Sequence, residues 1–518
     1  MAPNVDSELP LVLLSHRGPV SFGRDGDRRT ATKGSGGLVT ALLGLAEHLS
    51  DAVWVCAASS DEDIAIAREA EGRSVQVQTS PQLLLVDEGT TPDDEGRALE
   101  VRMIETDPWA HEAFYTVVSN PILWFIQHGL YGLTFAPVLT ANEHAAFTDG
   151  YVAVNSAFAD AVAEEVEARG GRALVMLQDY HFYLVAGDVR KRCPEALLSH
   201  FIHIPWPGPD SWRVLPPYMR DKLLLGLLGS DVVAFHTERY ARNFVHCCSE
   251  LLGLRVDLDA LTVEVDGRTV YARHYPISVD PAALEAVAAT DEVAAHVATL
   301  TDTYLASREE SGEPEDPPRR LVVRVDRTDP SKNVVRGFLA FGQLLDQHPE
   351  LAGSVSFLAL LQPSRTDVPE YSDYIATIGA VVAEINAKHT RHGQQPIDLR
   401  MVEDFPLAVA AYSICDVLMV NALADGMNLV AKEVPVVNER SGVLALSENT
   451  GAHEELGAFA VTLYPFDIQQ MADGLYEALT MPQADRARLL AAAAAQVREN
   501  DVSAWLSAQL RDLDRLRG

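Results

Sequence analysis

Short apolar runs alternate with segments of helical periodicity along most of this chain. Runs of this length without alternating polar positions are typical of parallel strands that are covered on both faces. In the first half they are PLVLLS, AVWVCAA, ALVMLQDYH, LSHFIHIPWP and DVVAFH. In the second half they are LVVRVDR, SVSFLALLQPSR, IDLRMVE, DVLMVNAL, GVLALSE and AFAVTLYP. Strands that alternate with helices predict an α/β fold with two doubly wound sheets.

The length of the chain predicts more than one domain. A single hydrophobic core rarely serves 518 residues, so we expect two domains of ordinary size. We place an N-terminal Rossmann-like domain at residues 1–276 and a second one at residues 277–485. Two helical segments, RARLLAAAAAQVREN and SAWLSAQLRDLDRL, fill residues 486–518, and we expect them to return to the N-terminal domain. Residues 307–320, rich in Pro, Gly and acids, predict an exposed loop inside the second domain.

The stretch ADGMNLVAKE (Ala424 to Glu433) follows one of the buried strands and is the most informative in the chain. A strand, a glycine turn and a helix start place backbone N–H groups where phosphates bind in open α/β sheets. Glu433 is expected two turns into the helix, too far from Asp425 to share a proton with it. The structural alternative is a helix capped by Asp425 with Glu433 in solvent.

Other polar residues also follow predicted strands. Arg327 and Lys332 lie five residues apart across a strand-to-helix turn and could reach one phosphate from a solvent-facing position. A solvated loop with two surface cations is an equally weighted alternative. Asp179, His181 and His203 end two strands and would cluster if those strands are neighbours, although histidines at strand ends are more often structural.

Composition and charge narrow the class of protein. The chain is 47% hydrophobic and 22% charged, as in globular proteins, and carries a net charge of -33. That charge argues against nucleic acids and anionic membranes as partners, while acidic domains often carry it for solubility. Five cysteines without metal-ligand spacing favour a reduced cytoplasmic protein. The N-terminus does not read as a signal peptide, and no stretch is long and apolar enough to span a membrane.

Several motifs together resemble one enzyme family. They are GSGG, QDYH, HIPWP, VDRTDPSK, LQPSR, ADGMNLVAKE and GVLALSENTGA, in this order. The chain resembles the trehalose-6-phosphate synthases, retaining glycosyltransferases of family 20, from about Leu11 to the last helix. The resemblance implies the GT-B architecture, in which two Rossmann-like domains face each other across an active-site cleft. We also expect a soluble enzyme without a cofactor or metal, and a homo-oligomeric assembly is left open.

The resemblance assigns the acceptor, glucose 6-phosphate, to residues of both halves. Arg17 matches the family arginine that binds the phosphate, and Arg365 matches its partner from the other domain. Tyr115 and Trp124 match the aromatic pair beside the acceptor. From the residues alone both aromatic side chains would be core residues. Asp179 matches a residue that contacts the sugars.

The resemblance assigns the donor, a nucleoside diphosphate glucose, mainly to the second half. Gly37 matches a glycine whose N–H meets the diphosphate, and Arg327 and Lys332 match the cations on it. His203 joins Asp179 in contacting the sugars. The site for the transferred glucose matches Asp425 with the N–H groups of Met427, Asn428 and Leu429, and Glu433 matches the ribose acceptor. The expected catalytic set is Asp179, His203, Arg327, Lys332 and Asp425.

Three departures from the family pattern bear on the donor. Gln178 replaces the first histidine of HDYH, Ala57 replaces a tryptophan, and Ala424 replaces an arginine. Separately, the features QDYH, HIPWP, RTDPSKN and VNER resemble an actinobacterial subgroup, and this resemblance favours GDP-glucose over UDP-glucose. The base pocket would lie around Met401 to Ala411. The same subgroup leaves open a pseudo-glycosyltransferase that joins a GDP-cyclitol to an aminocyclitol phosphate, as validoxylamine 7'-phosphate synthase does. A non-catalytic sugar-phosphate-binding regulator is a third possibility, but it would be expected to have lost some of these cations.

Overall fold

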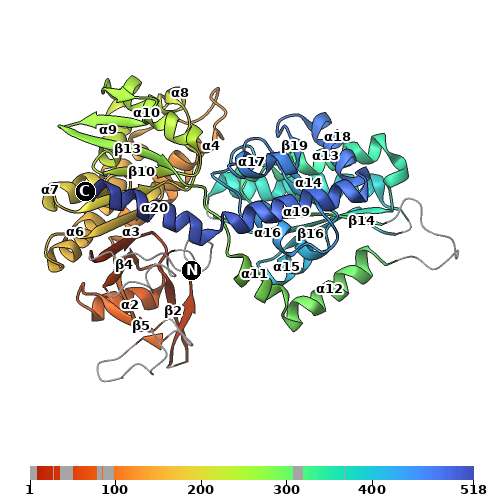
Figure 1. Ribbon diagram of the computed structural model, residues 1–518, viewed down its shortest axis with the longest axis horizontal. Helices are drawn as coiled ribbons and strands as arrows, with labels where there is room; N and C mark the ends of the chain where they lie inside the picture. The colour runs from red at the N-terminus through yellow and green to blue at the C-terminus, as the bar shows by residue number, and fades with distance from the viewer. Residues whose placement is uncertain are drawn as a thin grey trace. The chain divides into compact units, whose positions relative to one another are not determined.

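The computed structural model describes residues 9–26, 28–34, 42, 51–78, 84–85, 98–306, 319–366, 368–391 and 393–517. The chain forms two compact units (Figure 1). Unit 1 comprises Met1–Tyr275 and Leu506–Gly518, and unit 2 comprises Pro276–Trp505. The division therefore falls one residue before the expected domain end at residue 276. The two C-terminal helices separate, because α19 (Gln483–Glu499) lies in unit 2 and most of α20 (Val502–Arg517) lies in unit 1.

Unit 2 is built on a six-stranded parallel sheet with the order β16-β15-β14-β17-β18-β19. The strands are β14 (Arg320–Arg327), β15 (Val355–Gln362), β16 (Ile397–Met401), β17 (Val417–Val420), β18 (Val443–Ser447) and β19 (Val461–Leu463). Successive strands are added outward in both directions from β14 and β17. The carboxyl ends of these two neighbours are therefore the point at which the strand order reverses, where open α/β sheets bind their ligands.

Both faces of this sheet are covered, which explains the uninterrupted apolar runs in its strands. One face packs in a hydrophobic core with α13 (Val334–Gln347), α14 (Pro369–His389) and α18 (Ile468–Thr480). Beneath the other lie α15 (Phe405–Ile414), α16 (Val430–Val437) and α19. The remaining helices of this unit are α11 (Pro281–Ala288), α12 (Asp291–Tyr304) and α17 (Ala452–Leu456), with short 3-10 turns at Pro330–Lys332, Pro349–Leu351 and Gly457–Phe459.

Unit 1 contains a second sheet, whose parallel centre has the order β7-β4-β1-β8-β9-β10-β13. These strands are β1 (Leu11–Leu14), β4 (Ala52–Ala57), β7 (Ala98–Ile104), β8 (Leu174–Gln178), β9 (Leu197–Phe201), β10 (Val232–Phe235) and β13 (Arg268–His274). Antiparallel strands extend both edges: β5 (Val75–Gln78), β6 (Leu84–Leu85), β11 (Val256–Asp257) and β12 (Thr262–Val265). A hairpin of β2 (Val20–Asp25) and β3 (Arg28–Lys33) follows β1. Two doubly wound sheets are thus present, as predicted.

The helices of unit 1 include a long π-helical stretch within the aromatic-rich segment. This stretch, Ala113–Leu123, contains Pro121 and joins α3 (Pro108–Glu112) to α4 (Trp124–His128). This π-helical form was not predicted from the sequence. The other helices are α2 (Asp61–Glu69), α5 (Ala141–Ala145), the π-helical Ala146–Val152, α6 (Ala153–Ala168), the 3-10 turn Tyr180–Phe182, α7 (Val185–Arg192), α8 (Pro209–Trp212), α9 (Pro217–Leu227) and α10 (Glu238–Leu252).

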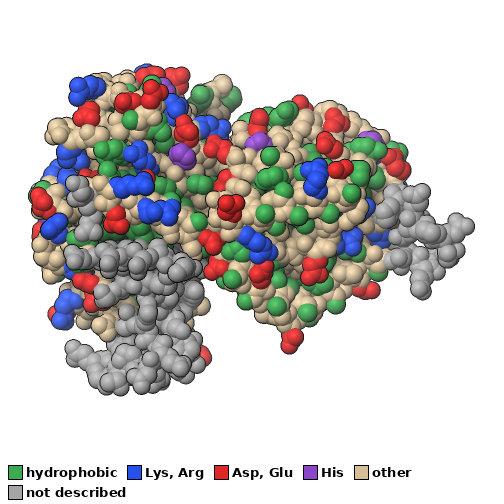
Figure 2. All heavy atoms as spheres, viewed as in Figure 1, with side chains coloured by type: hydrophobic (Ala, Val, Ile, Leu, Met, Phe, Trp, Pro, Cys, Tyr) green, Lys and Arg blue, Asp and Glu red, His purple; other side chains and the backbone are tan. Residues whose placement is uncertain are grey.

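The structure shows where the charged side chains and the cysteines lie. On the face drawn in Figure 2, acidic side chains are spread among Lys and Arg side chains. All five cysteines are buried as free thiols. No helix in the described part of the chain is long and apolar enough to cross a membrane.

Candidate active site

The carboxyl ends of β14 and β17 bring together the polar residues that follow them. β14 ends at Arg327, and a short 3-10 turn carries Lys332 back toward the sheet edge. Asp425 follows β17, and the Lys332 ammonium donates a hydrogen bond to its carboxylate. The two loops are also joined by Asn333, whose amide donates to the carbonyl of Asn421 at 3.0 Å. Residues 93 positions apart in the sequence thus form one charged site.

The turn between β17 and α16 is shaped by Asn428. Its φ of 77° lies in the left-handed region, which asparagine tolerates better than most residues. The Asn428 side chain donates to Asp425 Oδ2 at 3.1 Å and accepts from the N–H of Ala431 at 3.2 Å. Asn428 therefore supplies the side-chain cap of the helix start and orients Asp425. The alternative in which Asp425 caps the helix is wrong, because Asp425 binds Lys332 and Asn428 instead.

Glu433 lies nearer to this turn than the sequence suggested. α16 begins at Val430, so Glu433 is in its first turn and not two turns inside the helix. The helix starts late because Asn428 holds the left-handed conformation two residues earlier. Burial raises the pKa of Glu433 to about 7, although a hydrogen bond with Tyr412 opposes the rise. At neutral pH the carboxyl group is consequently poised between its neutral and charged forms.

Lys332 is largely enclosed, with a side chain only 14% exposed. Burial alone would lower the pKa of its ammonium, but the carboxylates of Asp425 and Asp326 outweigh burial and raise it. The expectation that Lys332 faces solvent is therefore wrong. Its charge is maintained by carboxylates whose geometry is already fixed.

Arg365 follows β15 and is held by a second buried carboxylate. Its guanidinium donates to Asp329 Oδ2 at 3.1 Å and to the hydroxyl of Tyr371. Tyr371 in turn donates to the same Asp329 oxygen at 3.0 Å. Arg365 itself has a φ of 50°, a strained conformation for a side chain of its size. A fixed, strained arginine at a strand end suits an anion-binding role.

One residue of this region was missed in the sequence. Arg324 points inward from the middle of β14 with a fully buried side chain and forms an ion pair with Asp326. The available signal was the cation itself, which interrupts the apolar run LVVRV. An unpaired charge is costly inside a protein, so a partner such as Asp326 was to be expected.

In unit 1, Asp179 and His203 lie at the ends of the neighbouring strands β8 and β9. Asp179 has a φ of 71°, and its carboxylate accepts a hydrogen bond from the N–H of His203 at 3.2 Å. The His203 ring lies 2.9 Å from the amide oxygen of Gln178. Burial, followed by the neighbouring His236 and His200, lowers the pKa of His203 well below its ordinary value. His203 is therefore neutral at physiological pH.

The other predicted residues of unit 1 lie beside the end of β1. Arg17 is exposed, and the adjacent His16 ring stacks on Tyr115 at 5.0 Å and on His181 at 4.8 Å. Trp124 is only 5% exposed and stacks on His128 at 4.0 Å. His181 thus joins the ring cluster beside Arg17, while His203 contacts Asp179. Gly37 lies outside the described residues, as do Ser35 and Gly36.

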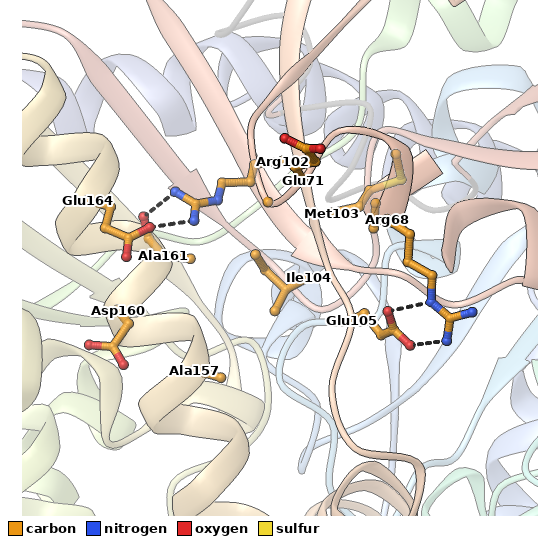
Figure 3. Close-up of a pocket in the computed structure, with 12 residues that line it drawn as sticks. Arg68, Glu71, Arg102, Met103, Ile104, Glu105, Ala157, Asp160, Ala161 and Glu164 are labelled. Atoms are coloured by element: carbon orange, nitrogen blue, oxygen red, sulfur yellow. Dashed lines mark hydrogen bonds and ion pairs between the residues drawn. The ribbon is translucent and has the colours of Figure 1, made fainter. Parts of the chain in front are cut away.

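A surface pocket of about 380 Å³ lies elsewhere in unit 1, between α2, β7 and α6 (Figure 3). Two ion pairs lie among its lining residues, Arg68–Glu105 at 2.5 Å and Arg102–Glu164 at 2.6 Å. Its lining contains none of the described residues that were assigned to substrates. No cluster of three or more His, Cys, Asp or Glu with metal-binding geometry occurs within the described ranges.

A comparison with known protein families covers the strand-end residues of both units. The sequence model of glycosyltransferase family 20 matches residues 10–515 of this chain. This chain belongs to glycosyltransferase family 20. It is 30% identical over 494 residues to alpha,alpha-trehalose-phosphate synthase (UDP-forming) 1 of Aspergillus niger, covering 94% of this chain and 86% of the relative. It is 28% identical over 510 residues to validamine 7-phosphate valienyltransferase of Streptomyces hygroscopicus subsp. jinggangensis, covering 97% and 94%.

Solved structures of family 20 enzymes extend this similarity to the fold. One is an alpha,alpha-trehalose-phosphate synthase (UDP-forming) from Burkholderia xenovorans in complex with glucose-6-phosphate. It is 27% identical, has a TM-score of 0.78, and is matched over 98% of this chain and 100% of its own. The family and the GT-B class with two Rossmann-like domains are thus confirmed, and the chain is a glycosyltransferase.

Proposed function

We propose that this family 20 glycosyltransferase is a trehalose-6-phosphate synthase. It transfers glucose, with retention, from a nucleoside diphosphate glucose to glucose 6-phosphate and forms an α,α-1,1 linkage. The observation that carries the proposal is the Lys332–Asp425 pair at the switch point of unit 2, with Arg327 at the end of the same strand. Positive charge and a sugar-binding carboxylate are adjacent there.

In this proposal Arg327 and Lys332 bind the donor diphosphate. As the glycosidic bond breaks, negative charge develops on the leaving phosphate, and fixed cations stabilise it without reorganising. Asp425 and the N–H groups of Met427, Asn428 and Leu429 hold the transferred glucose. Glu433, in the first turn of α16, accepts hydrogen bonds from the ribose. The acceptor hydroxyl then attacks from the face that the leaving group vacates, and the departing phosphate takes its proton.

We assign the acceptor phosphate to Arg17 and Arg365. The Asp329–Tyr371 pair fixes Arg365 before the acceptor arrives, which lowers the entropy cost of binding. The ring of Tyr115 stacks on His16, the residue before Arg17, and can line the sugar site. Trp124, which is buried and stacks on His128, is assigned to the same acceptor site. Asp179 and His203 contact the sugars as acceptors and donors of hydrogen bonds.

GDP-glucose is the donor that we favour. The support is the subgroup resemblance together with two exposed apolar side chains, Met401 at the end of β16 and Phe405 at the start of α15. They are 41% and 49% exposed and offer stacking surface to a large base. Ala57 lies at the end of β4, where its N–H donates to the carbonyl of His16 at 3.1 Å. The replacement of tryptophan by Ala57 is therefore relevant to acceptor binding and not to recognition of the nucleotide base.

A second candidate function is the transfer of a cyclitol from a GDP-cyclitol to an aminocyclitol phosphate. It is favoured by the similarity to validamine 7-phosphate valienyltransferase over 97% of this chain. The same cations would bind the donor diphosphate. The two candidate functions differ in the transferred group that would lie beside Asp425, glucose or a cyclitol. Analysis of the reaction products therefore distinguishes them.

The test is product analysis by NMR. Purified protein is incubated with glucose 6-phosphate and GDP-, UDP- or ADP-glucose at equal concentrations. We expect a disaccharide phosphate whose two anomeric protons both show the small coupling of α-linkages, formed fastest from GDP-glucose. Faster reaction with UDP-glucose would overturn the base assignment alone. Product from a GDP-cyclitol, with none from any glucose donor, would establish the second candidate instead.

A further inference from the structure

Arg324 connects the three pieces of backbone that build the donor site. From the middle of β14 its Nε donates to Asp326 Oδ2 at 2.9 Å. Its Nη2 donates to the carbonyl of Lys332 at 2.6 Å and to the amide oxygen of Asn421 at 2.7 Å. One buried guanidinium thus ties the strand end, the Lys332 turn and the end of β17 together.

The fold provides a specific space for this guanidinium. Gly337 of α13 lies directly over it: a Cβ at this position would come within 2.5 Å of Arg324 Nη1 and 3.1 Å of Asn421 Oδ1. Any larger residue at position 337 would push the guanidinium from its partners. The strand and the helix are therefore matched to one arginine.

The charges of this cluster are unequal in number. The cluster contains three cations, Arg324, Arg327 and Lys332, and two carboxylates, Asp326 and Asp425, which leaves one net positive charge. Asp326 is itself buried, and burial raises its pKa even though Arg324 and Lys332 oppose the rise. Without Arg324 the positive charge of Lys332 would be shared between two carboxylates, and the site would be neutral.

We propose that Arg324 is a positioning residue that offsets the charge of Asp326, so that Arg327 and Lys332 remain available to the donor diphosphate. The inference rests on the proposed function of this site. Arg324 does not touch the substrate in this account. It acts through Asp326 and through the carbonyl of Lys332.

The test measures the dissociation constant of GDP and UDP by titration calorimetry, together with the KM of each substrate. Arg324→Met should weaken nucleotide binding about tenfold to a hundredfold, as expected for loss of one charge of a buried pair. The KM of glucose 6-phosphate should change by less than about threefold, because the acceptor site is formed mainly by other residues. Arg324→Lys, which retains the charge, should recover most of the affinity.

The double variant Arg324→Met/Asp326→Asn is the decisive arm, because it removes both charges and restores the net charge of the site. We expect its nucleotide affinity to return to within about threefold of wild type. A double variant as weak as Arg324→Met would overturn charge compensation. Gly337→Ala leaves every charge in place and should weaken binding by displacing the guanidinium; unchanged binding would contradict the positioning role.

Arg486→Met is the matched control, since Arg486 is equally buried in unit 2 and paired with Asp416 at 3.0 Å. It should lower the melting temperature without changing nucleotide affinity. An equal loss of affinity in both arginine variants would show a general effect of unfolding and overturn the inference. Wild-type protein that binds neither nucleotide would overturn the proposed function, whereas wild-type binding that Arg324→Met leaves unchanged overturns this inference alone.

Discussion

Lys332 illustrates how burial and charge oppose each other at the level of single residues. Taking an ammonium out of water favours its neutral form, but two carboxylates within the same site keep it charged. The ion pair with Asp425 is therefore not a surface salt bridge of small consequence. A donor diphosphate that displaces Asp425 from Lys332 would exchange one anion for another at a prepared cation.

We predict that Lys332→Ala and Arg327→Ala each lower kcat about 100- to 1,000-fold, as removal of one contact to a developing oxyanion commonly does. Lys332→Ala should also lower the melting temperature, because it leaves the Asp425 carboxylate largely buried with one partner fewer. Steady-state kinetics and thermal denaturation measure the two effects. Turnover at the wild-type rate in both variants would show that these cations do not bind the leaving group.

Glu433 predicts a pH dependence. Its pKa is raised to about 7, so between about pH 4.3 and 7 the folded protein binds more protons than the unfolded chain. The free energy of unfolding contributed by this group is thus fully present below that range and is lost as the pH rises through 7. Glu433→Gln should flatten this part of the stability profile in chemical denaturation between pH 5 and 8.

Ionised Glu433 is the better hydrogen-bond acceptor for ribose hydroxyls. Nucleotide affinity of the wild type should therefore increase between pH 6 and 8, and the increase should be absent in Glu433→Gln. An identical slope in both proteins would assign the pH dependence to another group.

Site residues at strand ends could be predicted from the sequence, whereas a site residue within a strand was missed. Lys332, Asp425 and Asn428 lie together because β14 and β17 are neighbours, as a doubly wound sheet requires. Arg324 was missed because its partners are 2, 8 and 97 positions away, and only the folded chain brings them to one guanidinium. Glu433 was placed too deep in its helix because the left-handed residue that delays the helix start has no unique sequence signature.

Among the elements, the β17–α16 turn is the one on which donor binding depends most. It requires a left-handed residue at Asn428 whose side chain also reaches Asp425 and the N–H of Ala431. Asn428→Ala should lower stability by about 1–2 kcal/mol through loss of the cap and strain at positive φ, and should raise the donor KM.

Asn428→Gly is the matched variant, because glycine adopts this backbone conformation freely. It should be more stable than Asn428→Ala while keeping the raised donor KM, since neither residue can orient Asp425. Equal donor KM values in Asn428→Gly and wild type would show that Asp425 needs no such support.

The elements themselves followed from the apolar runs. All eleven strands named from the sequence are present, because covered parallel strands leave long apolar stretches. The antiparallel strands at the edges of the first sheet were not predicted, nor were the parallel strands β7 and β13, whose sequences ALEVRMI and RTVYARH contain charged residues. β11 has only two residues, and exposed positions such as Asp257 dilute the apolar signal.

At the scale of the whole molecule, the proposal divides the work between two Rossmann-like units. In that proposal unit 2 carries the fixed cations for the donor, and Arg17 and Arg365 are the residues proposed for the acceptor phosphate. In this proposal water is excluded from the reacting atoms only when both substrates are bound. Hydrolysis of the donor without an acceptor should accordingly be slow.

The most direct test is the rate of nucleoside diphosphate release from GDP-glucose, measured with glucose 6-phosphate, with glucose, and with neither. Release should depend on glucose 6-phosphate, and glucose should be a poor acceptor because it leaves Arg17 and Arg365 without their anion. Arg365→Ala should raise the KM of glucose 6-phosphate far more than that of the donor. Equal rates with glucose and glucose 6-phosphate, or no acceptor-dependent release from any nucleoside diphosphate glucose, would contradict the proposed transfer.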